Sequence, residues 1–242
     1  MTYQYKIADK IIEINSIYPD VHEYCKDYRV VGMSDFSVTI LKEDIEFEKT
    51  KSLREAEVEG VSPYHYPDGY LEELAVYRKI ASEMIDYNTI LFHGSVVSVD
   101  DEAYLFTAKS GTGKSTHTRL WRKYFGERAI MVNDDKPLLK VDEKGVFAYG
   151  TPYNGKHRIS NNICVPLKAI VILNRAETNT IVPSDKSEVF PMLLQQTYRP
   201  DDKIKMIKTL KILDRLSDNV RLYKLYCNMD IEAAKIAYEG MK

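Results

Sequence analysis

One short segment of the sequence has the residue types and spacing of a phosphate-binding loop. Residues 110–116 read SGTGKST. Such a loop binds phosphate through backbone N–H groups at a helix N-terminus, a lysine that reaches the β- and γ-phosphates, and a hydroxyl that binds Mg²⁺. Lys114 would be the phosphate lysine and Ser115 the Mg²⁺ ligand. We expect the remaining loop residues to contact the same cofactor, namely Ser110, Gly111, Thr112, Gly113 and Thr116.

Ala108 stands where the strict pattern G-x-x-x-x-G-K-[ST] has its first glycine. Alanine is compatible with that turn if its φ stays negative, and Gly111 still supplies conformational freedom inside the loop. An apolar run precedes the loop, and a helical pattern with Leu120 and Trp121 follows it. We therefore predict a working phosphate site, the alternative being a glycine-rich turn that binds no ligand.

A pair of carboxylates, Asp134 and Asp135, follows the apolar run 128–132. We expect the pair at the carboxyl edge of the sheet, where open α/β folds bind ligands. Phosphoryl transfer to a hydroxyl needs a carboxylate that orients and deprotonates the nucleophile, together with oxygen ligands for Mg²⁺. Two adjacent carboxylates could divide these tasks. The alternative is a solvated turn before Pro137.

A basic triplet and a histidine could also contribute to such a site. Lys156, His157 and Arg158 form a basic triplet that could clamp the γ-phosphate or an acidic substrate, although a solvated loop is equally typical of such a run. We name Lys156 as a cofactor-binding candidate. His93 ends an apolar run, a pattern that by itself more often indicates a structural histidine.

The rest of the sequence indicates the elements that position these residues. Short apolar runs broken by polar turns predict β-strands within residues 1–60, and a loop over 62–69 separates them from a helix over 69–87. From residue 89 onward we predict strands over 89–99 and 103–108, a helix over 114–124, a strand over 128–132, a hairpin over 137–150, a loop over 150–162, a strand over 167–173, helices over about 185–197 and 201–217, a strand over 221–227, and a helix from 230. This order divides the chain into a β-rich N-terminal appendage, residues 1–66, and a nucleotide-binding catalytic core, residues 67–242.

Composition narrows the class of function. The 242 residues carry a net charge of −2, so no general basic field favours nucleic acid or anionic membrane as a partner. Cys25, Cys164 and Cys227 have no spacing typical of a zinc site or a disulfide framework, and we expect reduced thiols. Because no signal peptide or membrane span is evident, we expect a cytoplasmic protein.

Four pieces of the sequence together resemble a known family. They are HGSVV (93–97), AYLFTA (103–108), SGTGKS (110–115) and VNDD (132–135). In order and approximate spacing they resemble the C-terminal domain of bacterial HPr kinase/phosphorylase and its relatives, which share a compact P-loop kinase core with phosphoenolpyruvate carboxykinase. The resemblance covers about residues 90 to 175. It implies an α/β fold of this type, to which residues 1–66 would be appended.

The resemblance also implies roles for individual residues. Lys114 and Ser115 would hold ATP and Mg²⁺, Asp134 would be the catalytic base, Asp135 would support the metal, and His93 would lie near the transferred phosphate. Thr116 replaces the acidic residue that HPr kinases carry after the loop serine, so the sequence leaves open whether the protein also removes phosphate, as HPr kinase/phosphorylase does. The chain is also too short for the substrate domain of phosphoenolpyruvate carboxykinase.

These expectations lead to two hypotheses. The first is an ATP- and Mg²⁺-dependent kinase that phosphorylates a hydroxyl of a protein, a peptide or a small metabolite. The second is a catalytically idle nucleotide-binding module that regulates a partner. The intact pair Asp134 and Asp135 favours the kinase, because a binding module needs no base. The sequence leaves open the acceptor, the donor among ATP, GTP and pyrophosphate, and whether the chain forms a homo-oligomer.

Overall fold

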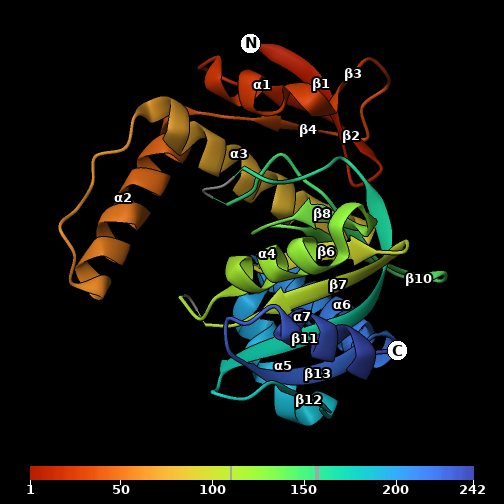
Figure 1. Cartoon of the computed structure of the whole chain (residues 1–242). Helices are drawn as coiled ribbons and strands as arrows, with labels where there is room; N and C mark the ends of the chain where they lie inside the picture. Colours follow the sequence, from red (N-terminus) through yellow and green to blue (C-terminus); the bar gives the residue numbers. More distant parts are fainter. Residues whose placement is uncertain (110, 156–157) are drawn as a thin grey trace. The chain divides into compact units, whose positions relative to one another are not determined.

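Contacts along the chain divide the protein into two units, Met1–Glu83 and Met84–Lys242. The structure, a computed structural model, describes residues 1–109, 111–155 and 158–242 (Figure 1). This division falls one helix later than the predicted boundary at residue 67. Helix α3 (Asp68–Met84) groups with the first unit because its Glu72 carboxylate accepts hydrogen bonds from the backbone N–H groups of Ile17 and Tyr18.

The first unit contains a four-stranded sheet in the order β3-β1-β2-β4. Its strands are β1 (Thr2–Ile7), β2 (Lys10–Asn15), β3 (Arg29–Val30) and β4 (Phe36–Thr39). The antiparallel pair β1 and β2 is closed by Ala8 and Asp9, whose positive φ values suit a tight hairpin turn. Alternate residues of both strands are buried, as the period of a half-buried strand requires. Two short helices, α1 (Asp20–Tyr24) and the 3₁₀ turn η1 (Lys26–Tyr28), follow β2.

Residues 42–59 form helix α2 (Lys42–Glu59), which the sequence analysis did not predict. With 18 residues, α2 contains as many residues as the four strands together, so the prediction of a β-rich segment is wrong here. The segment is rich in Glu and Lys, both strong helix formers, but it has no continuous apolar stripe that would indicate the helix period. Ion pairs from Arg78 to Glu48 and from Lys79 to Asp44 join α3 to α2.

The second unit is a mixed α/β structure built on a nine-stranded sheet. The main path runs β5-β9-β10-β11-β7-β6-β8, and β13 pairs with β11 and with β12. Strands β7, β11 and β13 are parallel, and β6 is antiparallel to its neighbours β7 and β8. The strands are β5 (Thr89–Leu91), β6 (Ser95–Val99), β7 (Glu102–Thr107), β8 (Ala129–Asn133), β9 (Leu138–Asp142), β10 (Gly145–Tyr149), β11 (Cys164–Arg175), β12 (Thr180–Pro183) and β13 (Arg221–Cys227).

Helices cover both faces of this sheet (Figure 1). The helical segments are η2 (Ile85–Tyr87), α4 (Lys114–Phe125), η3 (Gly126–Arg128), α5 (Lys186–Gln196), α6 (Lys203–Asn219) and α7 (Glu232–Gly240). Because side chains alternate along a strand, β7 feeds two cores: Leu105 packs with residues of α5 and α6, whereas Tyr104 and Phe106 pack with residues of α4 and α7. The central strands are therefore buried on both faces, and functional groups can gather only at their ends.

Most predicted elements of this unit are confirmed, including the hairpins β6–β7 and β9–β10. The run predicted as one strand over 89–99 is broken, because β5 pairs with β9 while β6 pairs with β7 and β8. The break falls at residues 92–94 and includes His93. Strand β12 was not predicted. Within the described ranges, every helix lacks the length or the apolar character needed to cross a membrane.

Candidate functional site

The predicted phosphate loop connects the end of β7 to the start of α4. Ala108 is buried and does not have a positive φ, so alanine fits this position without backbone strain. Gly111 has a φ of 75° and Gly113 a φ of 122°, values that strongly favour glycine. The helix begins at Lys114, directly after Gly113. The local geometry is therefore that of a glycine-rich turn leading into a helix N-terminus.

Lys114 is half-buried and turns back over the loop. Its Nζ lies 3.5 Å from the carbonyl oxygen of Ala108. Burial lowers the pKa of Lys114, and the charge of Asp135 acts in the opposite direction. The ammonium group thus shares its electrostatic environment with a member of the acidic pair.

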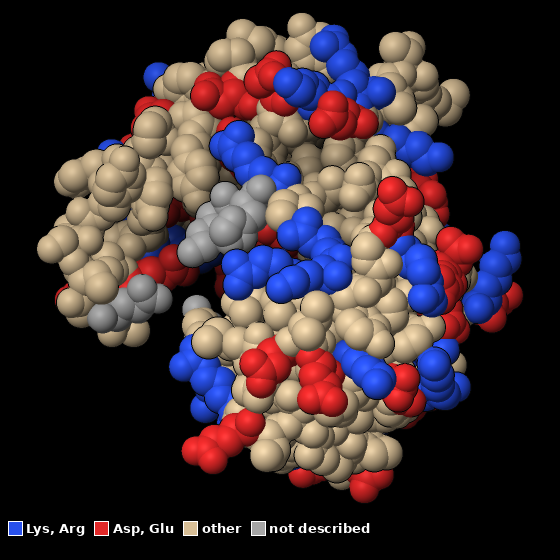
Figure 2. Space-filling view, viewed as in Figure 1, with Lys and Arg blue, Asp and Glu red and all other residues tan. Residues whose placement is uncertain are grey.

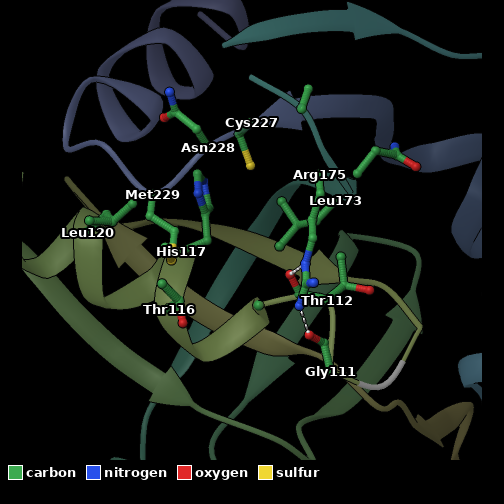
Figure 3. A pocket seen from close by; sticks show the side chains of 13 residues that line it. Gly111, Thr112, Thr116, His117, Leu120, Leu173, Arg175, Cys227, Asn228 and Met229 are labelled. Atoms are coloured by element: carbon green, nitrogen blue, oxygen red, sulfur yellow. Dashed lines mark hydrogen bonds between the residues drawn. The ribbon is translucent and has the colours of Figure 1, made fainter. Parts of the chain in front are cut away.

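Arg175, at the end of β11, holds the opposite side of the loop. Its Nε donates to the carbonyl oxygen of Thr112 at 3.2 Å, and a second guanidinium nitrogen donates to that of Gly111 (Figure 3). The carbonyl group of Thr112 and the N–H group of Gly113 belong to the same trans peptide and point in opposite directions. Because the carbonyl faces Arg175, the N–H of Gly113 points away from it. The sequence analysis missed Arg175, which has no motif around it.

Asn133, the last residue of β8, organises the turn that carries the acidic pair. Its Oδ1 accepts hydrogen bonds from the backbone N–H groups of Asp135 and Lys136 at 2.9 and 2.6 Å. Its Nδ2 donates to Thr151 and to the carbonyl oxygen of Tyr153. An asparagine before two aspartates is typical of such a turn, and this was the available sequence signal for its role.

Asp134 is held by the segment that follows β10. Its Oδ1 accepts the backbone N–H of Gly155 at 2.6 Å, and the side chain is buried, with 4% of the residue exposed. A Cβ at Gly155 would lie 3.2 Å from Asp134 Oδ2 and 3.3 Å from the Cβ of Asp135. Glycine therefore allows the close approach of this backbone to the acidic pair. The sequence analysis did not identify this role.

Asp135 contacts His93 at the break between β5 and β6. His93 Nε2 lies 3.1 Å from Asp135 Oδ1, and both side chains are partly exposed, at 44% and 27%. Burial raises the pKa of Asp135, but the hydrogen bond and electrostatic interaction with His93, together with the positive charges of Lys136 and Lys114, hold this pKa below its usual value. Asp135 is therefore ionised at neutral pH, beside Lys114.

Hydrogen bonds to backbone carbonyl groups fix His93 and the acidic pair relative to the ends of β6 and β7. Thr107 Oγ1 donates to the carbonyl oxygen of His93 at 3.0 Å, and the N–H of Gly94 donates to that of Asp135 at 3.0 Å. Ser95 Oγ donates to the carbonyl oxygen of Asp134 at 2.7 Å. Because β6 is antiparallel to β7 and β8, its first residues lie beside the carboxyl ends of both. The break within 89–99 thus brings His93 to this edge.

The residues present fit a Mg²⁺ ion that would take most of its oxygen ligands from a bound phosphate compound and from water. Ser115 is exposed in the first turn of α4, and Asp135 has a second carboxylate oxygen besides the one that meets His93. Among the described residues, no group of three or more His, Cys, Asp or Glu side chains could hold a metal alone. Magnesium in phosphate-transfer sites is typically bound by one or two protein oxygens together with phosphates and water, so this small donor set suffices.

A cavity of about 440 Å³ lies on the other side of the loop, beside α4 and the ends of β11 and β13 (Figure 3). Its walls include Gly111, Thr112, Gly113 and Thr116, four of the predicted cofactor-binding residues. Arg175 also lines it. Lys and Arg side chains gather over α4 on the surface, with acidic side chains grouped nearby (Figure 2).

The structure thus brings together Lys114, Asp135 and His93, with Asp134 adjacent in the chain. Ser110 and Lys156, as well as His157, lie outside the described residues, so their predicted roles stay predictions. Arg158 is described and has a φ of 51°.

Comparisons with known proteins add little to this picture. No family model matches the sequence, and no curated protein matches it. Among solved structures, the structure of the Hpr(Ser) kinase/phosphatase from Coxiella burnetii matches with 9% sequence identity and a TM-score of 0.35, over 62% of this chain and 95% of that chain. The fold is a mixed α/β structure, and function is inferred from the residues of the site.

Proposed function

We propose that the chain is a phosphotransferase that moves the γ-phosphate of a nucleoside triphosphate, with Mg²⁺, to a hydroxyl group of a protein, a peptide or a small metabolite. The observation that carries the proposal is the electrostatic coupling of Lys114 with Asp135, which also contacts His93, next to a glycine-rich turn and a helix N-terminus. A lysine for phosphate oxygens and carboxylates for the metal and the proton are what this reaction requires.

Each residue has a proposed task in the reaction. Backbone N–H groups of the loop and Lys114 would bind the phosphates, and Ser115 with Asp135 would hold Mg²⁺, which neutralises phosphate charge when bound. The acceptor oxygen forms a bond to the γ-phosphorus while the bond to the bridging oxygen of the diphosphate breaks. Asp134 receives the acceptor proton, and His93 orients Asp135 through their contact.

One observation favours the alternative of a nucleotide-binding module without catalysis. Asp134 is buried, and one of its oxygens already accepts the N–H of Gly155. Hydrogen bonds around a catalytic base often rearrange when substrate binds, so this geometry does not remove Asp134 as the base. It makes the assignment open to a direct test.

The test is a screen for transfer from γ-labelled ATP to hydroxyl-bearing peptides, proteins and metabolites at saturating Mg²⁺. Acceptor-dependent labelling that is lost in Asp134→Asn supports the phosphotransferase. Binding of Mg-ATP without labelling of any acceptor supports the binding module, and absence of any nucleotide or polyphosphate binding contradicts both.

A further inference from the structure

The exposed side of helix α4 carries positive charge that nothing in its own segment balances. Residues 103–126, which include the phosphate loop and all of α4, contain five Lys and Arg residues and no Asp or Glu, although the whole chain has 36 acidic and 34 basic residues. Figure 2 shows Lys and Arg side chains gathered over α4. A local surplus of one sign of charge is suited to binding a partner of the opposite sign.

Arg119 and Arg122 lie on the same side of α4 as Ser115. Successive residues of an α-helix are about 100° apart, so these three residues fall within about 60° of one another. Ser115 and Arg119 are exposed, and Arg122 is partly exposed. The two arginines, which we call the arginine surface, therefore form a row that starts beside the proposed Mg²⁺ ligand and leads away from the phosphate loop. The buried residues of the helix lie on its opposite side and are His117, Thr118, Trp121 and Phe125.

The arginine surface has no counter-ion of its own. Neither Arg119 nor Arg122 forms an ion pair with any residue that the structure describes, and Arg122 Nε is buried without a hydrogen-bond partner there. Leaving a buried donor unsatisfied is costly. The helix dipole stabilises positive charge in the last turn, which accounts for Arg122 but not for Arg119, one turn earlier. A partner with carboxylate groups would supply acceptors to both guanidinium groups.

The spacing of the arginines favours a peptide segment over a small metabolite. With a rise of about 1.5 Å per residue, Arg119 and Arg122 lie about 6 and 10 Å from Ser115 along the helix axis. A small metabolite whose hydroxyl lies at the reaction centre would not span the distance to both arginines. An extended peptide advances about 3.4 Å per residue, so acidic residues about two and three positions from the hydroxyl-bearing residue would reach them.

Acidic side chains near the arginine surface favour a short anionic segment over a nucleic acid. Helix α7 packs with α4 in one core cluster, and its Glu232 and Glu239 are exposed. Figure 2 shows acidic side chains next to the basic group over α4. A long polyanion would meet this negative charge as well as the arginines, whereas a segment with two carboxylates can contact the arginines alone. The arrangement therefore fits an acidic stretch of a peptide or protein.

We infer that the arginine surface binds an acidic segment of a peptide or protein acceptor, with Arg119 and Arg122 pairing with carboxylates about two and three residues from the hydroxyl that receives the phosphate. The inference rests on the proposed function and narrows its acceptor, which that proposal leaves open among proteins, peptides and metabolites. The arginines hold the acceptor in place, and the reacting groups are those of the phosphate loop and the acidic pair.

The first test measures the preference for acidic peptides. The probes are synthetic peptides with one serine and two glutamates, placed two and three residues before or after it, and the same peptides with glutamine in place of glutamate. Titration calorimetry gives Kd, and transfer from γ-labelled ATP gives kcat/KM. We expect one glutamate peptide to exceed its glutamine counterpart about tenfold in both affinity and kcat/KM, and less at high salt. Equal values for both peptides, or tighter binding of a single-stranded RNA of similar length, overturn the inference.

The second test removes the arginine surface. Arg119→Gln/Arg122→Gln removes two positive charges, and Lys211→Gln/Arg215→Gln removes two from exposed residues of α6 as the matched control. We expect the preference for glutamate to disappear in the first variant and to persist in the second. If thermal unfolding shows that the double variant on α4 is unstable, Arg119→Gln alone replaces it, because that side chain is exposed, and the preference should fall about threefold. A preference that persists in the folded α4 variant overturns the inference.

Failure of this inference can be told apart from failure of the proposed function. Transfer at equal rates to glutamate and glutamine peptides would support the phosphotransferase and overturn the arginine surface. Binding that prefers glutamate and depends on Arg119, without transfer to any peptide, would support the arginine surface and contradict the phosphotransferase. Inorganic tripolyphosphate reports on the phosphate loop alone. If it binds more weakly to Arg119→Gln than to the wild type, Arg119 belongs to the phosphate site and the inference is overturned.

Discussion

The two flanks of the phosphate loop differ in how completely their polar groups are satisfied. On the β8 side, Asn133, Asp134 and Asp135 each take part in hydrogen bonds or ion pairs that fix their positions. On the β13 side, the cavity wall contains much apolar surface and a buried nitrogen, His117 Nδ1, that has no hydrogen-bond partner among the described residues. Polar groups that are already fixed in position are suited to catalysis. A buried donor without an acceptor is suited to binding a ligand. Variants on the two flanks should therefore change different quantities.

The largest effect is expected on the acidic flank. Asp134→Asn preserves the shape of the side chain but cannot accept a proton, so turnover should fall by about 10²–10⁴. ATP affinity should persist, because the loop and Lys114 still bind the phosphates. Single-turnover transfer at saturating ATP, compared with Asp135→Asn, measures the effect. Transfer within a few-fold of wild type would assign the base to Asp135 or His93.

Lys114→Ala removes the positive charge at the start of α4, which lies between the two flanks of the loop. We expect the affinity for Mg-ATP to fall by about 10–100-fold, the value of one charge-assisted hydrogen bond, while the protein stays folded. Lys123→Ala on the exposed surface of the same helix is the matched control. Calorimetric titration and thermal unfolding of both variants provide the measurement. Wild-type ATP affinity in folded Lys114→Ala would exclude the loop as the phosphate site.

Asp135→Asn should separate metal binding from nucleotide binding. The Mg²⁺ concentration for half-maximal activity should rise severalfold, because one of the few protein oxygens near the phosphates loses its charge. The affinity for metal-free ATP should not fall. Activity titrated with Mg²⁺ at fixed ATP tests this, and an unchanged curve would move the metal role to Asp134.

Gly155→Ala probes how tightly the acidic flank is packed. The added methyl group would contact Asp134 Oδ2 and the Cβ of Asp135 at 3.2 and 3.3 Å, so we expect a few-fold loss in kcat and little change in KM for ATP. Steady-state kinetics separate the two constants. A change in KM alone would mean that the 151–161 segment contributes to nucleotide binding rather than to the acidic pair.

The smallest effect concerns pH and the β13 side of the loop. The pKa of His117 is lowered from 6.5 to about 3 in the folded protein, so the unfolded state takes up the proton first as pH falls. The free energy of unfolding contributed by neutral His117 is therefore complete above pH 6.5 and is lost as pH falls from 6.5 toward 3, by at most about 1.4 kcal/mol per pH unit. We expect the free energy of unfolding, measured by urea titration at each pH, to fall less steeply between pH 7 and pH 5 in His117→Gln than in the wild type. Equal slopes would mean that His117 can take up a proton in the folded protein.

The parts of the fold that follow local patterns could be predicted from the sequence. The hairpin β6–β7 consists of two apolar runs separated by Asp100 and Asp101, and α4 follows a glycine-rich turn, so both were predicted. Helix α2 was missed because its sequence has helix formers without an apolar stripe. The break at His93 was missed because β5 and β6 together read as one apolar run, and only pairing with different partners separates them.

The same distinction applies to the site. Lys114, Asp134 and Asp135 belong to short motifs, and the residue types and spacing of these motifs predict their chemistry. Arg175 and Gly155 lie far from those motifs along the chain, and they reach the site through tertiary structure. Sequence patterns therefore identify the groups proposed to react, whereas the residues that hold the loop and the acidic pair in place are found only from the fold.

The contact of Arg175 with the carbonyl oxygens of Gly111 and Thr112 has a consequence for the rate at which a ligand binds. A glycine-rich turn in solution samples many conformations. A ligand that binds only one of them binds more slowly, and its affinity falls in proportion to the population of that conformation. Arg175 restricts these two peptide groups during folding, before any ligand arrives. Conformational entropy is thus lost once per folding event and not once per binding event, which favours rapid binding and release of a ligand on a loop that is already preorganised.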